Sequence, residues 1–435
     1  MNVTLPYGHG ELAVELPPEC RVKVFTRPAF EGDGRTEGER IRSALDHPIG
    51  RDLGRVVENC LARCGEPSAV IVIGDSTRGT PNSAILSPLL ERMQASGVKR
   101  QNITVLIGCG KHREPFAEEI NRLVDPSLVR GIRLASHRAG KNETVYLGTT
   151  SRGTPVRLNK VYVEADLRIV TGMIEPHQLC GYSGGAKGAF IGLGDEETIA
   201  CNHSLLTSPM ARADILEGNP MREDMEEGFG LAKADFIVNV VLDAKDQVLR
   251  AFAGTYPEAY LAGVRFARDT SRVGFEAPCN LVLVSCGGDP KDINLYQAQK
   301  ALSHVESLVA PSGIVILFAR CPDGPGDDGF VRWMKEARSL GSIIERFGRE
   351  GFQLGAHKAF LLARNLVKAR TFLVSELDEE AAGRFFFMVS SDPDDAVKKA
   401  LRLLAAEGVT KPVVGVVPQG TGILLFEHGG AADAA

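Results

Sequence analysis

The sequence predicts an α/β protein of two domains, each with a mostly parallel sheet flanked by helices. Short apolar runs rich in Val, Ile and Leu alternate with stretches of helical period, which is typical of parallel strands covered on both faces. The length of 435 residues also exceeds what one hydrophobic core usually contains. We expect domains at residues 1–274 and 275–435, because a helical stretch at 256–272 lies between two series of strands.

The first domain is expected to begin with a hairpin and to continue with strand-and-helix repeats. The segments "NVTL" and "ELAVEL" flank the turn "PYGHG", as the two strands of a hairpin would. The strands that follow are predicted at residues 69–74, 102–108, 165–172 and 234–243. Amphipathic stretches at 83–97 and 115–124 predict the first two connecting helices.

The second domain repeats this alternation of strands and helices. Its strands are predicted at residues 280–288, 313–321, 371–376 and 412–420. The stretch 394–408 has a helical period and precedes the last of these strands. The small and polar residues at 428–435 are typical of a frayed chain end.

Composition excludes several classes of protein. A net charge of -5, from 50 basic and 55 acidic residues, provides no basic surface for nucleic acid or an anionic membrane. No apolar run reaches the roughly 18 residues that a spanning helix needs, and we expect no signal peptide. Nine cysteines without a CxxC pair are expected to be reduced thiols, most of them buried. We therefore expect a cytoplasmic protein with no nucleic-acid or membrane partner.

Polar side chains capable of chemistry follow directly after four of the predicted strands. The segments are "GDSTR" after 69–73, "GCGKHRE" after 103–107, "EPH" after 167–172 and "GGDPKDINLYQ" after 281–286. Ligands of open α/β sheets bind outside the carboxyl ends of the strands. These loops therefore predict one active site, which we expect in a cleft between the two domains.

The glycine-lined lysine in "GYSGGAKG" (181–188) admits three interpretations. The segment resembles a phosphate-binding loop, but Ala186 replaces the last glycine and Gly188 stands where a Ser or Thr would hold magnesium. Lys187 can instead be a nucleophilic amine, because desolvation lowers the pKa of an ammonium group. On this segment alone, a surface lysine in a glycine loop also fits.

Histidines near this lysine favour the chemical interpretation. His177 and His203 flank Lys187, and His112 follows the turn "GCGK". Three histidines in such places suit one metal ligand and an acid/base pair, whereas a lone histidine is more often a packed or solvent-facing residue. We expect the remaining six histidines to be packed or solvent-facing residues: His9, His47, His137, His304, His357 and His428. Cys180 is a weaker candidate for a ligand or nucleophile, since no adjacent cation or helix start marks it.

Cationic and amide side chains suggest a small anionic substrate. Arg78 in "DSTR" can bind a carboxylate through two parallel hydrogen bonds. Gln297 and Lys300 are three residues apart, on one face of a predicted helix, and Tyr296 precedes them. Tyr296 and Gln297 lie near the helix start, which favours anions. Each charged residue among them also suits a solvated surface.

With these residues in order, the sequence resembles the nickel-pincer-nucleotide enzymes typified by lactate racemase. The central pattern is H-x9-K-x15-H, formed here by His177, Lys187 and His203 inside "EPHxxxGxSGGAKxxxxGL". Supporting elements are "DSTR", "GxGKHRE", "GNPMREDMEE" (218–227) and "DxNLYQAQKAL". The resemblance covers nearly the whole chain, and its specificity comes from the order and spacing of these elements.

The resemblance implies a covalently attached cofactor. Lys187 would carry a nickel pincer nucleotide, a pyridinium-3-thioamide-5-thiocarboxylate mononucleotide, with His203 as the fourth nickel ligand. His112 and His177 would be the acid/base pair. The residues implied around the cofactor and its phosphate are Asp75, Thr77, Arg78, Ser183, Gly184 and Gly185. Those implied for the substrate are Arg78, Tyr296, Gln297 and Lys300.

The implied reaction is inversion of C2 of a 2-hydroxy acid, as in a racemase or epimerase. Removing the C2 proton would leave a carbanion beside a carboxylate, whereas reversible hydride transfer to the cofactor gives a planar 2-keto acid. One histidine would take the hydroxyl proton, and the other would return a proton when hydride reaches the opposite face. The implied partners are the small 2-hydroxy-acid substrate and the enzymes that build the cofactor.

Two departures from the family pattern leave the substrate open. Gly79 stands where many relatives have proline, and Phe352 stands where lactate racemases tend to have tryptophan; the only tryptophan is Trp333. Lactate, malate, a longer 2-hydroxy acid or a sugar acid all remain candidates. Arg113, beside His112, could contact extra polar groups of such a substrate, or lie on the surface.

Two other functions remain alternatives to this racemase. The first is a lyase that forms a Schiff base with a keto substrate through Lys187. The second is a non-catalytic carrier or sensor of anionic metabolites.

Overall fold

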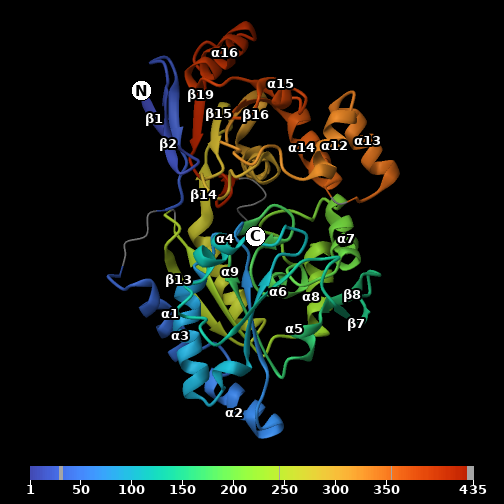
Figure 1. The fold of residues 1–435 in the computed structure, drawn as a ribbon. Helices are drawn as coiled ribbons and strands as arrows, with labels where there is room; N and C mark the ends of the chain where they lie inside the picture. The colour runs from blue at the N-terminus through green and yellow to red at the C-terminus, as the bar shows by residue number, and fades with distance from the viewer. Residues whose placement is uncertain (29–32, 244, 354, 429–435) are drawn as a thin grey trace. The chain divides into compact units, whose positions relative to one another are not determined.

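The computed structural model describes residues 1–28, 33–243, 245–353 and 355–428, and the chain forms two compact units (Figure 1). The central unit spans residues 29–270, and the terminal unit combines residues 1–28 with 271–435. Each unit contains a six-stranded sheet whose strand pairs are mostly or entirely parallel, flanked by helices. The predicted fold class is therefore confirmed.

The sheet of the central unit has the order β13-β12-β9-β4-β5-β6. Its strands are β4 (Ala69–Gly74), β5 (Ile103–Gly108), β6 (Arg133–His137), β9 (Leu167–Met173), β12 (Phe236–Leu242) and β13 (Val248–Gly254). Only β13 is antiparallel, since the connection from β12 is too short for a crossover. The four strands predicted for this unit are confirmed, whereas β6 and β13 were not predicted.

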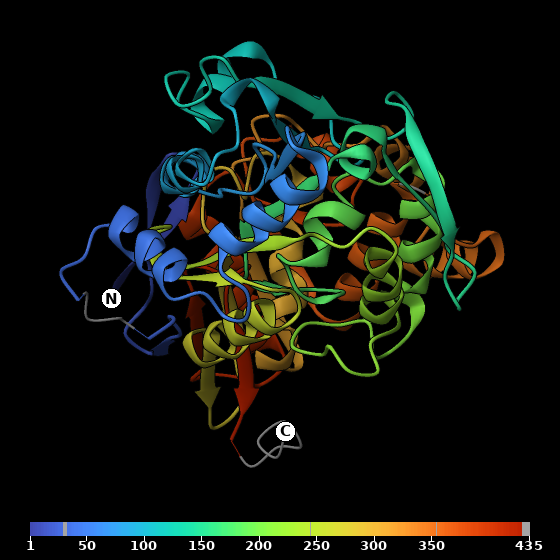
Figure 2. The ribbon, with the colours of Figure 1, turned by 90° about the horizontal axis from the view of Figure 1, so that it is seen from below.

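Helices cover both faces of this sheet, so its strands are apolar on both sides. The helices are α1 (Glu37–Asp46), α2 (Leu53–Cys64), α3 (Asn82–Ala95), α4 (Ala117–Leu123), α5 (Lys160–Glu164), α6 (Ala186–Phe190), α7 (Glu196–Ser204), α8 (Pro220–Gly230) and α9 (Glu258–Ser271). Ile71 and Ile73 of β4 belong to the core that α1, α2 and α3 cover. Helices α6–α8 lie on a different side of the strands from α1–α3 (Figures 1 and 2). Two small antiparallel pairs complete the unit: β7 (Thr144–Thr149) with β8 (Pro155–Asn159), and β10 (Pro176–His177) with β11 (Gly181–Tyr182).

Helices α7, which carries His203, and α8 begin at good capping residues. The Asp195 carboxylate accepts a hydrogen bond from Thr198 N (2.8 Å) at the start of α7. Helix α8 begins after Asn219, whose side-chain oxygen accepts from Met221 N (3.1 Å). Pro220 occupies the first position of α8, where a missing N–H is tolerated. The sequence thus specifies where both helices start.

The sheet of the terminal unit is entirely parallel, with the order β18-β17-β16-β15-β19-β3. Its strands are β3 (Arg21–Val24), β15 (Cys279–Ser285), β16 (Val309–Phe318), β17 (Arg370–Val374), β18 (Met388–Val389) and β19 (Val413–Val417). The predicted N-terminal hairpin is confirmed as β1 (Asn2–Tyr7) and β2 (Gly10–Glu15), with Tyr7 opposite Gly10. Strands β14 (Arg272–Phe275) and β20 (Leu424–Glu427) form a further parallel pair.

The helices of the terminal unit lie mostly between its strands in sequence. They are α10 (Leu295–Ala298), α11 (Lys300–Val305), α12 (Asp328–Glu336), α13 (Leu340–Glu350), α14 (Ala356–Lys368), α15 (Glu379–Gly383) and α16 (Pro393–Ala406). Helix α16 confirms the prediction at 394–408. Of the predicted tail at 428–435, all but His428 lies outside the described residues.

The N-terminal residues do not belong to the unit that follows them, which differs from the expected domain 1–274. Arg21 of β3 lies opposite Val413 of β19 in the terminal sheet. Val3, Leu5 and Val14 of the hairpin are buried in the core of the same unit. These pairings join segments almost 400 residues apart, and local sequence patterns contain no information about them. The central unit is therefore a continuous insertion into the terminal one.

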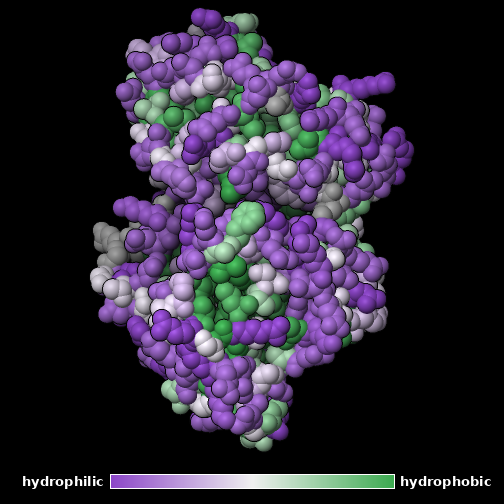
Figure 3. All heavy atoms as spheres, viewed as in Figure 1, coloured by the Kyte–Doolittle hydropathy of each residue, from purple (hydrophilic) through white to green (hydrophobic). Residues whose placement is uncertain are grey.

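Most of the face in Figure 3 is formed by hydrophilic residues, with a hydrophobic patch on its lower part. Among the described residues, no helix has both the length and the apolar character needed to cross a bilayer.

Three glycines let the end of α6 lie directly on the end of strand β5. A Cβ atom on Gly108 would lie 3.2 Å from Gly192 Cα and 3.3 Å from Gly188 O. A Cβ atom on Gly192 would lie only 2.1 Å from Gly188 O. Gly110 N also donates to Gly192 O (2.9 Å). The segment that carries Lys187 is thus in backbone contact with the loop that leads to His112.

We expect Gly192→Ala to destabilise the central unit. Its methyl group would force the backbone apart, which should lower the free energy of unfolding by about 1–3 kcal/mol. Urea unfolding followed by circular dichroism measures the loss, and hydrogen exchange of the β5 amides locates it.

Gly230→Ala is the matched control for this substitution. A Cβ atom on Gly230 would meet nothing within 4 Å, and the residue ends helix α8, so alanine should be neutral or slightly stabilising. Equal stability of the two variants would contradict the argument from close backbone contact.

Candidate active site

The loops after β4 and β5 start at the same level of the sheet and place an aspartate against a histidine. Gly74 and Gly108, the last residues of the two strands, lie opposite each other. His112 Nδ1 lies 2.6 Å from Asp75 Oδ2. Thr77 donates to the other carboxylate oxygen from its backbone N–H (3.1 Å) and from its hydroxyl (2.7 Å). Two of the predicted strand-end loops are therefore joined by a buried hydrogen-bond network.

Asp75 is buried but ionised. Its side chain is almost inaccessible, and burial alone would raise the pKa of the carboxyl group. The charge and hydrogen bond of His112, the Arg78 guanidinium and the Thr77 hydroxyl together outweigh burial and hold the pKa well below its usual range. Arg78 Nε lies 3.9 Å from Asp75 Oδ1, and its side chain is about one-third exposed (34%).

The ionised carboxylate fixes the proton of His112. A carboxylate can only accept hydrogen bonds, so Nδ1 of His112 must carry the hydrogen. In the neutral ring the lone pair then lies on Nε2, and Asp75 stabilises the imidazolium that forms when Nε2 takes a proton. The pair has the arrangement of a general base with its orienting carboxylate.

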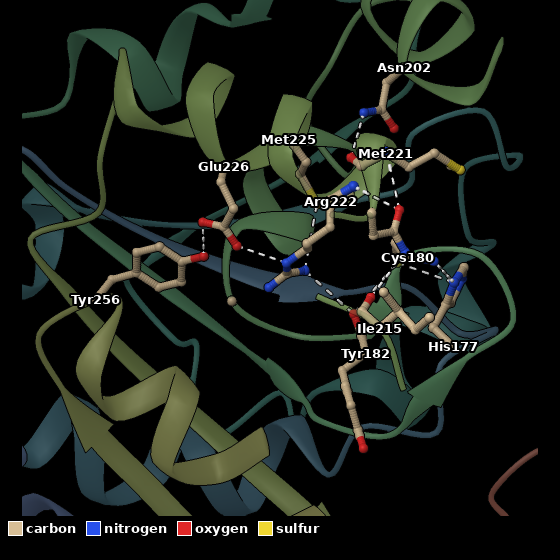
Figure 4. Close-up of polar contacts among 12 residues, drawn as sticks. His177, Cys180, Tyr182, Asn202, Ile215, Met221, Arg222, Met225, Glu226 and Tyr256 are labelled. Atoms are coloured by element: carbon tan, nitrogen blue, oxygen red, sulfur yellow. Dashed lines mark hydrogen bonds and ion pairs between the residues drawn. The ribbon is translucent and has the colours of Figure 1, made fainter. Parts of the chain in front are cut away.

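The hydrogen bonds of His177 place its ring hydrogen on the other nitrogen from that of His112. His177 ends β10, and its Nδ1 accepts from the backbone N–H groups of Leu179 (3.2 Å) and Cys180 (3.3 Å) (Figure 4). The thiol of Cys180 is also 3.2 Å from this nitrogen. Because Nδ1 is the acceptor, the neutral ring carries its hydrogen on Nε2. His177 therefore presents a hydrogen-bond donor, whereas His112 presents an acceptor.

Lys187 lies in the first turn of α6, after Gly185, whose φ of +53° favours glycine. Although the side chain is partly exposed, the protein atoms around its amine lower the pKa to about 8. The cations Arg78 and Arg222 lower it further, and Cys180 and Glu175 act in the opposite direction. A sizeable fraction of the amine is neutral near pH 8, as a nucleophilic lysine requires.

His203, in the last turn of α7, is oriented as metal-binding histidines usually are. Its Nδ1 donates to the backbone carbonyl of Ile199 (2.9 Å), which leaves the lone pair on Nε2. Among the described residues, no group of three or more His, Cys, Asp or Glu side chains is arranged to hold a metal ion.

The glycine loop before Lys187 is pressed against the end of β9. A Cβ atom on Gly184 would lie 2.8 Å from Ile174 Cγ1, and Gly185 N donates to Asn239 Oδ1 (2.9 Å). The Ser183 hydroxyl donates to the backbone carbonyl of Met173 (2.7 Å). The loop is thus held by its own contacts, and its side-chain hydroxyl is already engaged.

The three substrate-binding residues predicted in the other unit lie together in the terminal unit. Lys300 Nζ and Gln297 Oε1 are hydrogen-bonded, although the single helix predicted to carry both is divided into α10 and α11. Tyr296 makes edge contacts with Phe330 (ring centroids 5.9 Å apart) and His357 (6.1 Å). Phe352 packs on the same His357 (5.1 Å). Phe352, one of the two departures from the family pattern, therefore packs on a side chain that also contacts Tyr296.

Three residues discussed in the sequence analysis have structural roles. Trp333 is buried and packs on Phe347 (6.2 Å). Arg113 forms a bidentate ion pair with Glu119 (2.6 Å and 2.6 Å). His304 is buried, and burial lowers its pKa to about 4. All nine cysteines are free thiols, as predicted.

Sequence reasoning missed a mostly buried polar cluster near the lysine, formed by Arg222, Glu226, Tyr256 and Tyr260. Figure 4 shows the first three of these side chains. Arg222 belongs to "GNPMREDMEE", which was noted but given no role. A signal was present, because Arg222 stands between Met221 and Met225 on a helix with an apolar face. An arginine in such a position has to find partners inside the protein.

Comparison with known proteins relates both units to one family. Residues 7–214 match the lactate racemase N-terminal domain, and residues 275–425 match the lactate racemase C-terminal domain. The chain is 31% identical over 434 residues to the lactate racemase of Thermoanaerobacterium thermosaccharolyticum, covering 98% of this chain and 99% of that protein. It is also 31% identical over 431 residues to the lactate racemase of Lactiplantibacillus plantarum, covering 97% and 99%.

Solved structures agree with this assignment. The lactate racemase apoprotein from T. thermosaccharolyticum superposes with a TM-score of 0.88 at 30% identity, covering 98% of this chain and all of that chain. A Thermotoga maritima protein shares the fold, with a TM-score of 0.69 at 18% identity, covering 92% of this chain and all of that chain. With near-complete coverage by two lactate racemases and matches to both of their domains, the chain belongs to the lactate racemase family and is an isomerase.

Proposed function

We propose that this protein racemises or epimerises C2 of a 2-hydroxy acid, with a nickel pincer nucleotide attached to Lys187. The observation that carries the proposal is a lysine with a pKa of about 8 in the same unit as three histidines whose protons are fixed. The relatives named lactate racemase support the reaction class. Location in the cytoplasm, with the cofactor-building enzymes as partners, belongs to the same proposal.

The described residues fit such a cofactor. The neutral fraction of Lys187 suits a covalent tether, and Nε2 of His203 suits a single protein ligand to nickel. When bound, the group would supply an electron-poor carbon that can accept a hydride from C2 of the substrate and give it back.

His112 would take the proton of the substrate hydroxyl. Nε2 is the acceptor in its neutral ring, and the charge of Asp75 stabilises the imidazolium that results. The same proton on Nε2 can return to the oxygen in the reverse reaction.

His177 would donate a hydrogen bond from Nε2 to the substrate oxygen. If His177 is to deliver its Nε2 proton and end as a neutral ring, its Nδ1 has to be protonated first. That would break the hydrogen bonds from the amides of Leu179 and Cys180. A full acid role for His177 therefore requires the 178–181 turn to move.

Four side chains are proposed for substrate recognition. The Arg78 guanidinium suits the substrate carboxylate, and Tyr296, Gln297 and Lys300 supply further donors. Phe352 packs on His357 beside Tyr296, so it is a candidate for setting the size of the C3 substituent. Lactate, malate, longer 2-hydroxy acids and sugar acids are the substrates to test.

The direct test uses protein co-produced with the cofactor-building enzymes in the presence of nickel. Intact mass reports the adduct on Lys187, and chiral chromatography reports conversion of single enantiomers of the candidate acids. Conversion that is lost in Lys187→Ala supports the proposal. Racemisation by nickel-free protein would contradict it. Trapping of a keto substrate by borohydride would indicate a Schiff-base lyase, and tight substrate binding without turnover would indicate a carrier.

Acylation of Lys187 should follow its lowered pKa. The neutral amine reacts, so labelling of Lys187 by an acylating reagent should rise with pH around a midpoint near 8. Peptide mass spectrometry measures labelling of each lysine in the unloaded protein. Lys160 is the internal control, because its hydrogen bond with Glu143 raises its pKa and moves its midpoint above that of Lys187. Equal midpoints for the two lysines would contradict the desolvated site.

His203→Ala should lose nickel while the covalent adduct persists. Its Nε2 is the proposed protein ligand, whereas attachment occurs at Lys187. Elemental analysis and intact mass on the same sample separate the two effects. His47→Ala, at an exposed position of the same unit, should leave both unchanged. Wild-type nickel content in His203→Ala would rule out the ligand assignment.

Asp75→Asn should reduce turnover by roughly 10²- to 10⁴-fold. The neutral amide cannot stabilise an imidazolium, and its NH₂ group can donate to Nδ1 and move the hydrogen of His112 to Nε2. Turnover across pH 5–9 measures the effect, with unchanged adduct mass and nickel content as the control. Activity within threefold of wild type would show that Asp75 does not position the base.

A further inference from the structure

Cys180 is a buried thiol that lies against a ring nitrogen of His177, one of the two proposed acid/base residues. Its side chain is 1% exposed, and its Sγ lies 3.2 Å from Nδ1 of His177 (Figure 4). The backbone carbonyl of Tyr182 is a second acceptor, 3.5 Å from the same sulfur. A thiol has one hydrogen to donate, and the shorter contact directs it at His177.

Three donors meet at Nδ1 of His177, and they differ in what they can do with their hydrogen. Two are the backbone N–H groups of Leu179 (3.2 Å) and Cys180 (3.3 Å), and the third is the Cys180 thiol. A backbone amide keeps its hydrogen in a folded protein, whereas a thiol is an acid. Of these three donors, only the thiol can release a proton to the ring.

The backbone holds the turn that carries this thiol. His177 lies opposite Gly181 in the β10–β11 pair. Gly181 has a φ of +74°, and a Cβ atom on it would lie 2.4 Å from the carbonyl oxygen of Ile215. The Asn219 side chain donates to the carbonyl of Leu179 (2.8 Å). The contact between the thiol and the ring is therefore fixed by the main chain on both sides of Cys180.

A negative charge on Cys180 would act on two cations, Lys187 of α6 and Arg222 of α8. Burial lowers the pKa of Lys187, and Cys180 acts in the opposite direction. Burial also opposes the charge of Arg222, and Cys180 is among the groups that outweigh it and raise its pKa. Because such an interaction is mutual, both cations favour the thiolate. Glu226 compensates part of the Arg222 charge (2.8 Å), whereas burial keeps the neighbouring Tyr260 phenol protonated by raising its pKa.

We propose that Cys180 supplies the proton that Nδ1 of His177 needs when His177 acts as an acid. The Nε2–H bond breaks as an O–H bond forms on the substrate oxygen, and the S–H bond breaks as an N–H bond forms at Nδ1. The S–H electron pair stays on sulfur, so a thiolate and a neutral ring remain. The 178–181 turn then has only to release two amide hydrogen bonds, because the proton moves along a contact that already exists.

The reverse reaction uses the same contact. With Nδ1 protonated and the sulfur ionised, Nε2 carries the lone pair and can take the hydroxyl proton of the other enantiomer. Water restores the thiol through the ring of His177, which is partly exposed, whereas the sulfur is buried. Cys180 touches no substrate atom in this scheme and is a positioning residue. The inference rests on the proposed function, because that function gives His177 its acid role.

The test follows the ring hydrogen of His177 by NMR in the unloaded protein. Protein with ¹⁵N-labelled histidine is titrated, and His177→Gln assigns the signal. In wild type, ionisation of the thiol at rising pH should move the ring hydrogen from Nε2 to Nδ1, beside the new thiolate. Cys180→Ser keeps a donor that does not ionise, so its ring should retain the hydrogen on Nε2 throughout. Cys180→Ala, a second variant without a side-chain donor, should behave in the same way.

Cys60→Ser is the matched control for this experiment. Cys60 is also buried in the central unit, but its thiol donates to the backbone carbonyl of Asp166 (3.3 Å) instead. The movement of the His177 hydrogen should persist in this variant. A ring hydrogen that stays on Nε2 in wild type, or that moves in Cys180→Ser as well, would overturn the relay.

Turnover of the loaded protein tests the relay in the reaction itself. Cys180→Ser should reduce kcat by roughly 10-fold or more, because the acid step loses its proton supply. KM, adduct mass and nickel content should stay unchanged, since the residues proposed to bind substrate and cofactor are untouched. A kcat within twofold of wild type would show that the relay is not used. The NMR result needs neither cofactor nor substrate, so the relay and the proposed function can fail separately.

Discussion

Close backbone contact between α6 and the ends of the central strands is the constraint on which the site depends. Gly108, Gly188 and Gly192 meet at distances that leave no room for side chains. This contact brings the main chain around Lys187 against the loop that leads to His112. The crowding of protein atoms around the amine then lowers its pKa to about 8. The close packing that positions Lys187 therefore also makes its amine more reactive.

Hydrogen bonds at Nδ1 give the three histidines different chemical characters. His112 and His203 donate from Nδ1, to a carboxylate and to a carbonyl respectively, and so have acceptors at Nε2. His177 accepts at Nδ1 and has a donor at Nε2. The groups that decide this, Asp75 and the main chain around Ile199 and Leu179, come from the loops and helices rather than from the histidines themselves. In the proposed function, one residue type would thereby supply a base, a donor and a metal ligand.

Much of the fold could be predicted from the sequence, because buried parallel strands are continuous apolar runs. The strands at 69–74 and 412–420 illustrate this. Strand β6, with the sequence "RLASH", lacks such a run and was missed. Membership of β3 in the terminal sheet depends on a partner at the other end of the chain.

The candidate site was only partly predictable from the sequence. Motif spacing indicated Lys187 and the three histidines, but only coordinates reveal which nitrogen of each ring bears the proton. Arg222 was missed because its environment is assembled from α8, α9 and the glycine loop. The roles of Tyr296, Gln297 and Lys300 stay predictions, although their clustering in one unit is confirmed.

The insertion of the central unit into the terminal one has a consequence for biosynthesis. Residues 29–270 emerge from the ribosome as a continuous block and can fold as soon as they are complete. Strand β3, made near the beginning, has to wait for β19, since Arg21 pairs with Val413. During that interval β3 presents unpaired N–H and C=O groups, which are open to wrong partners. Its four residues, two of them charged, make it a short and polar strand, which limits that risk.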